Sequence, residues 1–314
     1  MGNRLNFTTA EDYENWFKRV QGYTQNVKNS LKNNMEGLEY GYTQPKLVTR
    51  GVTAQIKGLL EKDIEDHPYL TIFKGSFDVM SEDEANDLIN RVKTYIAEEL
   101  NPAYQALYDF LVDDYLPNSR DSVGISDVPG GKEWYEYLAR YHTTTDLTPD
   151  EIHEIGLREV ARIRAEMEDV IESVGWEGDF RSFLEFLRTD PQFYYETGEE
   201  LLQAYRAMSK EIDMYMPTLF NKLPRAPYGV IPIPMESAPF TTTAYYNSPS
   251  AGRPGYYYAN LYQPETRPKY EIPVLSVHEA VPGHHHQIAL AQELENVPKF
   301  RNYLSFTAFV EGWG

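Results

Sequence analysis

Proline most limits how this chain can fold, because seven of its 20 prolines are concentrated in residues 224–254. A proline inside a helix removes a backbone donor and collides with the preceding turn, so this segment excludes long helices. Tyrosine and threonine recur between the prolines, which favours short strands, and proline-rich strands are best tolerated at sheet edges. We therefore predict short strands over three ranges: Gly229 to Ile233, Thr241 to Tyr246 and Tyr256 to Leu261.

Upstream of this segment the chain has the pattern of helices. Apolar residues recur at helical spacing from Glu11 to Gly37, and Pro45 opens a second helix that runs to Leu60. Ser81 begins a capping sequence for a third helix, which we expect Asn101-Pro102 to break before another helix reaches Leu116. Thr148, followed by Pro149 and two acids, marks the start of a long helix to Val174. Shorter helices are predicted over residues 132–141, 180–187 and 199–216.

These patterns predict a mainly α fold with a small β-sheet. A helical domain would cover residues 1–222. The second region, residues 223–314, would add the short strands, a helix from about Tyr270 and another from Phe300, packed with the first as one unit.

Charge and composition exclude several classes of partner. Lys and Arg total 29 against 48 Asp and Glu, a formal charge of -19, which argues against nucleic acid or an anionic membrane as the main partner. No apolar run approaches the roughly 20 residues of a membrane-spanning helix. The chain has no cysteine, so His, Asp and Glu are the strong metal ligands that it offers.

Histidine is clustered in a way that indicates a metal site. Four of the seven histidines fall within residues 278–286. In the short zinc-peptidase motif two histidines four residues apart share a helical face, but here Pro282 stands at the second position. His284 lies six residues after His278, about 240° around an ideal helix. Pro282-Gly283 supplies a break that would bring His284 back beside His278.

His285 is the competing second ligand. It is nearly in phase with His278, but about 10 Å of helix rise separates the two residues. We therefore prefer His284 and assign His285 and His286 to supporting or substrate contacts.

The remaining ligand and the base come from two glutamates. Glu311, on the following helix, would be the anionic third ligand, and a fourth position would hold water. Glu279, beside the first histidine, would be the general base that takes a proton from zinc-bound water and passes it to the leaving nitrogen. The alternative without a function is a polar turn with incidental histidines and a surface carboxylate. That alternative leaves the joint spacing of the histidines and glutamates unexplained. His153-Glu154 repeats the pair without a later histidine, so we interpret it as part of a solvated helix.

Two sequence blocks and several shorter segments resemble the bacterial domain of unknown function 885 family. The specific blocks are residues 278–285 (His-Glu-Ala-Val-Pro-Gly-His-His) with Gln287, and residues 309–313 (Phe-Val-Glu-Gly-Trp). The shorter segments are residues 41–45, 147–149 with 152–153 and 156–157, 237–240, and 253–255 with 257–258 and 260. The resemblance therefore spans nearly the whole chain.

This resemblance implies a mostly helical metallopeptidase-like fold, related to thimet oligopeptidase and carboxypeptidase Taq. It also implies that the family domain is N- and C-terminally shortened here, since members usually begin upstream with a secretion or lipoprotein leader and continue far beyond Glu-Gly-Trp. Donors to the transition state from a later segment would then be missing. The location would be extracytoplasmic if a leader was removed, and cytoplasmic otherwise.

Peptidases of this kind pair an edge strand beside the metal with the substrate backbone. We expect Gly255 to Leu261 to be that strand, with Tyr257 and Asn260 as substrate contacts. The expected function is a Zn2+-dependent hydrolase acting on a peptide or small amide. The alternatives are a metal- or peptide-binding protein without turnover, and a metal-dependent hydrolase of other amides or esters.

Overall fold

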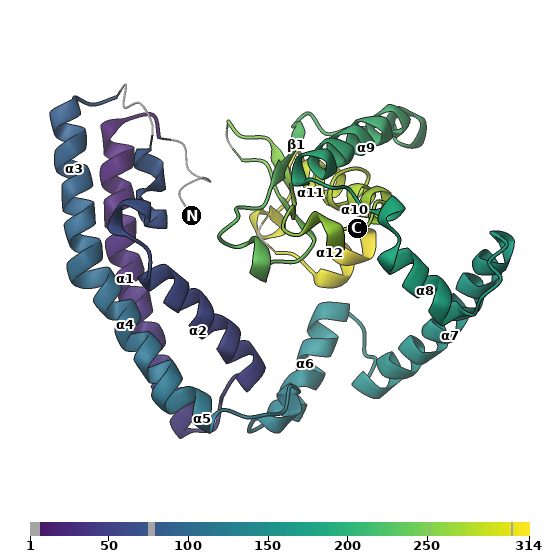
Figure 1. Cartoon of the computed structure of the whole chain (residues 1–314), viewed down its shortest axis with the longest axis horizontal. Helices are drawn as coiled ribbons and strands as arrows, with labels where there is room; N and C mark the ends of the chain where they lie inside the picture. Colours follow the sequence, from purple (N-terminus) through teal and green to yellow (C-terminus); the bar gives the residue numbers. More distant parts are fainter. Residues whose placement is uncertain (1–6, 75–78, 251, 303) are drawn as a thin grey trace. The chain divides into compact units, whose positions relative to one another are not determined.

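The computed structural model describes residues 7–74, 79–250, 252–302 and 304–314 (Figure 1). The chain divides into two compact units, Met1–Trp134 and Tyr135–Gly314, and each has its own apolar core. None of the helices in the described ranges has both the length and the apolar character that crossing a membrane would require.

Unit 1 is helical. Its elements are α1 (Ala10–Glu39), α2 (Lys46–Leu60), α3 (Glu82–Tyr95), α4 (Asn101–Phe110), α5 (Leu116–Asn118) and the first turn of α6 (Gly131–Thr143). Capping boxes start α1 at Thr9 and α3 at Ser81, the second of which the sequence predicted. The core joins aromatic side chains of α1, such as Trp16, to aliphatic side chains of the α3–α4 region, such as Val92 and Leu100.

The predicted break at Asn101-Pro102 was wrong, because the helical path continues through it. A π-helical turn over Ile96–Leu100 precedes Pro102, and a second one over Leu111–Tyr115 precedes Pro117 at the same spacing. The backbone N–H that follows each turn, that of Asn101 and that of Leu116, donates five residues back, to Ile96 O and to Leu111 O. The wider turn makes room for a ring that would collide with a normal α-helical turn.

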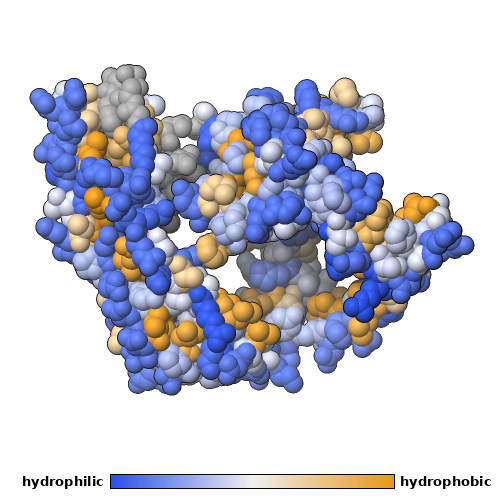
Figure 2. Space-filling model, in the orientation of Figure 1, coloured by the Kyte–Doolittle hydropathy of each residue, from blue (hydrophilic) through white to orange (hydrophobic). Residues whose placement is uncertain are grey.

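The helices of unit 2 are the rest of α6, α7 (Pro149–Ser173), α8 (Phe180–Thr189), α9 (Gly198–Leu219), α10 (Glu271–Glu279), α11 (His284–Gln292) and α12 (Thr307–Trp313). The capping box at Thr148 starts α7 as predicted. Apolar side chains recur along α7, but most of them are exposed and only Ile171 is buried, so they do not enter a core among the described residues. Figure 2 shows apolar surface in this region, over α7 and α8.

The three predicted strands are present, with shifted ends. They are β1 (Tyr228–Pro232), β2 (Ala244–Asn247) and β3 (Gly255–Ala259), in the order β1-β3-β2. β1 pairs with β3 in parallel and β2 pairs with β3 antiparallel, so Tyr257 lies opposite Val230 on one side and Tyr246 on the other. Pro232 ends an outer strand, as expected of a proline-containing strand.

The core of unit 2 surrounds this sheet. Leu201 and Tyr205 of α9 pack in one cluster with Val230 and Tyr257 of the sheet and Ile272 of α10. The predicted boundary between residues 222 and 223 therefore falls inside a single core, and the division between the two units lies earlier, at Trp134. The mixed sheet and α9 together support α10, which carries the first residues of the candidate site.

Candidate metal centre

A sharp turn joins the two helices that carry the histidines. α10 ends at Glu279 and α11 begins at His284, so the break predicted at Pro282-Gly283 is confirmed. A Cβ on Gly283 would collide with the carbonyl oxygens of Val277 and His278. Only glycine therefore lets the chain turn this tightly against the end of α10.

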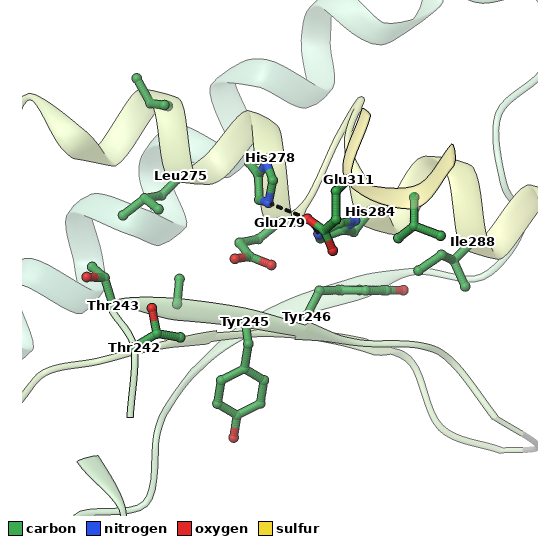
Figure 3. A pocket seen from close by; sticks show the side chains of 13 residues that line it. Thr242, Thr243, Tyr245, Tyr246, Leu275, His278, Glu279, His284, Ile288 and Glu311 are labelled. Carbon is green, nitrogen blue, oxygen red and sulfur yellow. Dashed lines mark ion pairs between the residues drawn. The ribbon is translucent and has the colours of Figure 1, made fainter. Parts of the chain in front are cut away.

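The turn brings three predicted ligands together. His278, His284 and Glu311 each offer a ligand atom, and these atoms lie within 4.8 Å of one another. Oε2 of Glu311 is 3.8 Å from Nε2 of His278 and 3.7 Å from Nε2 of His284, and Figure 3 shows the three side chains converging from α10, α11 and α12. His284, and not His285, therefore stands beside His278.

The donor set suits zinc. Two imidazoles and one carboxylate are ligands that catalytic zinc takes, with a fourth position left for water. Donors around a tetrahedral zinc ion lie about 3.3 Å apart, so the spacing here is slightly wider than that of a closed site. Burial lowers the pKa of His284, which keeps its imidazole neutral as ligation requires. That these residues bind an ion stays a prediction.

Glu279 lies next to this group and is nearly buried, with 6% of its surface exposed. Burial raises the pKa of its carboxyl group to about 7; the His278 imidazole opposes this shift and the Glu311 carboxylate adds to it. A group that can hold or release a proton near neutral pH is suited to general acid–base work.

The four side chains line a pocket of about 650 Å³. Thr242 to Tyr246 form one wall, which includes most of β2, and Val274 and Leu275 of α10 contribute to the opposite wall. In Figure 3 the β2 segment runs beneath the histidines, with Tyr246 below His284 and the Tyr245 ring directed away. An extended ligand could therefore lie between β2 and the candidate metal ligands.

The expectation that the segment Gly255 to Leu261 is an edge strand was wrong. Gly255 to Leu261 contains β3, which is the central strand and is paired on both sides. Such a strand has no free edge for another backbone. The strand beside the pocket that has an unpaired edge among the described strands is β2.

Tyr257 and Asn260 lie in the core, both with 0% of their surface exposed. The Asn260 amide donates to the carbonyl oxygens of Ala238 and Thr241 at 2.8 and 3.1 Å, and the Tyr257 ring packs edge-on against Tyr205. Asn260 thus fixes the segment that leads into β2. In this arrangement neither side chain is exposed to a substrate, and their effect on the pocket is indirect.

His285 has a supporting role. Its Nε2 lies 3.0 Å from the carbonyl oxygen of Ala226, which can only accept, so Nε2 carries the proton. Nδ1 then accepts from the Tyr246 hydroxyl at 2.8 Å. A Cβ on Gly255 would crowd both groups, so glycine is needed there for this contact. With both ring nitrogens engaged, His285 is not free to bind an ion, and it holds Tyr246 under the pocket.

Three functional candidates were not predicted from the sequence. Nothing in the sequence distinguished Tyr246 from the other tyrosines. Gln287 and Trp313 carried the family resemblance, but their contacts depend on how α12 packs. The Trp313 indole donates to the carbonyl oxygen of Pro282 at 2.7 Å, and the Gln287 amide donates to that of Phe309 at 2.9 Å.

Fold and site together define a mainly α-helical protein with a small mixed sheet and a His-His-Glu group. The chain belongs to the family described as bacterial protein of unknown function (DUF885), whose model matches residues 1–314. The resemblance inferred from the sequence is thereby confirmed.

A solved structure has the same fold. It is described as "the putative lipoprotein from Colwellia psychrerythraea", is 27% identical and superposes with a TM-score of 0.91 over 98% of this chain. The match covers 54% of that protein, so the chain spans about half of its length. Among functionally curated proteins none matches this chain.

Proposed function

We propose that this protein is a zinc-dependent hydrolase, and that its substrates are peptides. The observation that carries the proposal is the convergence of His278, His284 and Glu311 beside the buried carboxyl group of Glu279, in one pocket. A helical peptidase fold of the thimet oligopeptidase or carboxypeptidase Taq kind is part of this proposal.

The side chains have separate roles in the proposed reaction. A bound zinc ion supplies Lewis acidity toward the scissile carbonyl and lowers the pKa of water toward about 7. Glu279 accepts the proton of the attacking water at its carboxylate and delivers it to the leaving nitrogen. No side chain forms a covalent bond with the substrate. His284 and Glu279 are buried, with 8% and 6% of their surfaces exposed, which limits their contact with bulk water.

The substrate would be held in extended form along β2. Antiparallel pairing with β3 uses one edge of β2, which leaves the other edge unpaired among the described strands, and residues of β2 line the pocket. Backbone hydrogen bonds to a strand edge recognise a peptide whatever its sequence, and the pocket walls would add side-chain preference. A peptide backbone is the ligand that such an edge suits best.

Two alternatives have some support. One is metal or peptide binding without turnover: the chain matches about half of the solved relative, and catalysis can require groups from the part that it does not match. The ligands and base would serve other amides or esters equally well. The description of the relative as a lipoprotein favours an extracytoplasmic location for this protein too.

Hydrolysis of a mixed peptide library, with parallel amide and ester substrates, tests the proposal. The zinc-loaded protein should cleave peptides, and Glu279→Gln should retain zinc while losing at least about 100-fold in rate, the size of a general-base contribution. The matched control is Glu154→Gln, which removes a glutamate after a histidine on the exposed surface of α7. Zinc binding with no cleavage of any substrate would favour the non-catalytic alternative, and no zinc binding would reject both.

A further inference from the structure

α12 carries Glu311 but contributes nothing to the core. It is seven residues long and none of its side chains is buried. Isolated helices of this length are unstable in water, and buried apolar surface is what usually holds them. The position of the Glu311 carboxylate therefore depends on other contacts.

Two hydrogen bonds flank Glu311 symmetrically. Two residues before it, the carbonyl oxygen of Phe309 accepts from the Gln287 amide at 2.9 Å. Two residues after it, the Trp313 indole donates to the carbonyl oxygen of Pro282 at 2.7 Å. We call these four residues, Pro282, Gln287, Phe309 and Trp313, the clamp.

The clamp joins α12 to the segment that carries the histidines. Pro282 lies in the turn two residues before His284, and Gln287 lies three residues after it on α11. At the start of α12 the hydroxyl of Thr307 lies 2.8 Å from Nδ1 of His142. Two of the hydrogen bonds that dock α12 thus come from the same segment as the ligand group, whereas the His142 contact comes from α6.

From this geometry we infer that Trp313 and Gln287 are positioning residues, which dock α12 so that Glu311 completes the ligand group. Ion binding and the docking of α12 are then one coupled event. The inference rests on the proposed function, because it assigns these two residues to the same ion.

This coupling determines how far the loss of a clamp hydrogen bond should weaken zinc binding. Without the clamp, α12 would become ordered only when the ion binds. The conformational entropy that α12 loses in becoming ordered would then lower the affinity of the site for the ion. A single hydrogen bond contributes little net stability, so losing one should weaken zinc binding about three- to tenfold.

Zinc affinity, measured by competition with a coloured chelator, tests this on the whole chain. Trp313→Phe and Gln287→Leu remove the two donors while keeping bulk. Trp134→Phe is the matched control, because Trp134 and Trp313 are similarly exposed, at 49% and 47%, and the structure gives the Trp134 indole no hydrogen bond within the described residues. We expect the first two variants to bind zinc about three- to tenfold more weakly and the control to bind like the wild type.

The absorption spectrum of the Co2+-loaded protein separates positioning from a general loss of structure. If the clamp places Glu311, the spectra of Trp313→Phe and Gln287→Leu should move toward that of Glu311→Gln, with the unfolding midpoint of the metal-free protein unchanged. Wild-type affinity and spectrum in both variants would overturn the inference, as would a lower midpoint with unchanged affinity. If the wild-type chain binds neither Zn2+ nor Co2+, the proposed function is rejected instead. The inference about the clamp, which rests on that function, is then rejected as well.

Discussion

Glu279 is a buried carboxyl group next to two histidines and a second carboxylate. Burial is the largest cause of its raised pKa, at about 7 against 4.5 for an exposed glutamate. The folded protein therefore holds this proton between about pH 4.5 and 7, whereas the unfolded chain releases it. The stability that this proton contributes is fully present below pH 4.5 and is lost as the pH rises through 7.

Glu279→Gln should therefore stabilise the metal-free protein at alkaline pH. Glutamine keeps the shape of the side chain and removes the charge that the site desolvates, so at pH 8 unfolding should become harder by about 1–3 kcal/mol. At pH 4.5 the two proteins should be nearly equal. Urea unfolding of metal-free samples at both pH values measures this, and equal stability at pH 8 would show that the carboxylate is well solvated.

The two histidines and the adjacent glutamate of the candidate metal centre could be predicted from the sequence because local spacing carries the signal. A histidine and glutamate before Pro-Gly-His lie in one short segment, and the Pro-Gly pair itself predicts the turn that brings His278 and His284 together. The contacts of Tyr246 and Trp313 could not be identified in this way. Each depends on a partner more than 25 residues away in sequence, in a position that only the folded chain sets.

At the scale of elements, the turn between α10 and α11 determines whether the site can form. Gly283 lies against the last carbonyl groups of α10, with no room for a Cβ. Backbone carbonyls cannot move aside as a flexible side chain would, so any substitution must displace the start of α11. That displacement would separate His284 from His278.

Gly283→Ala should therefore weaken zinc binding by at least about tenfold and destabilise the protein by more than about 1 kcal/mol. Gly156→Ala is the matched control, because Gly156 lies inside α7 with open space around its Cα. Alanine there should be neutral or stabilising, since it favours the helix. Zinc titration and thermal unfolding of both variants provide the comparison. Wild-type zinc affinity in Gly283→Ala would show that a Cβ at this position does not displace α11.

The elements themselves were easier to predict than their arrangement. Alternating tyrosine and threonine between prolines identified three strands, but such a pattern does not say which strand lies in the centre. β3 is buried on both faces and β2 is not, and this difference arises from packing against α9 and α10. Pro102 was misleading for a similar reason, because a π-helical turn accommodates it where sequence rules expect a helix to end.

At the scale of the whole molecule, the two units have separate cores, and the candidate metal centre belongs to one of them. The buried cluster of unit 1 draws on residues 13–115, whereas the cluster under the metal centre draws on residues 201–280. A ligand that binds only the folded form stabilises what it touches. Zinc should therefore act on unit 2 alone if the units unfold separately.

Two buried leucines allow a matched test of this separation. Leu100 and Leu201 both have 0% of their surface exposed, in unit 1 and unit 2 respectively. Truncation to alanine should cost each unit about 2–5 kcal/mol. Leu100→Ala should leave zinc affinity unchanged, whereas Leu201→Ala should weaken it, because Leu201 packs in the cluster that supports α10.

Hydrogen exchange across a urea series, resolved by peptide, measures both units at once. Zinc at 100 times its dissociation constant should raise the opening free energy of unit 2 peptides by about 2.7 kcal/mol and leave those of unit 1 unchanged. In Leu100→Ala the unit 1 peptides alone should open more easily. Equal protection of both units by zinc would mean that they unfold cooperatively, and the metal centre would then stabilise the entire chain.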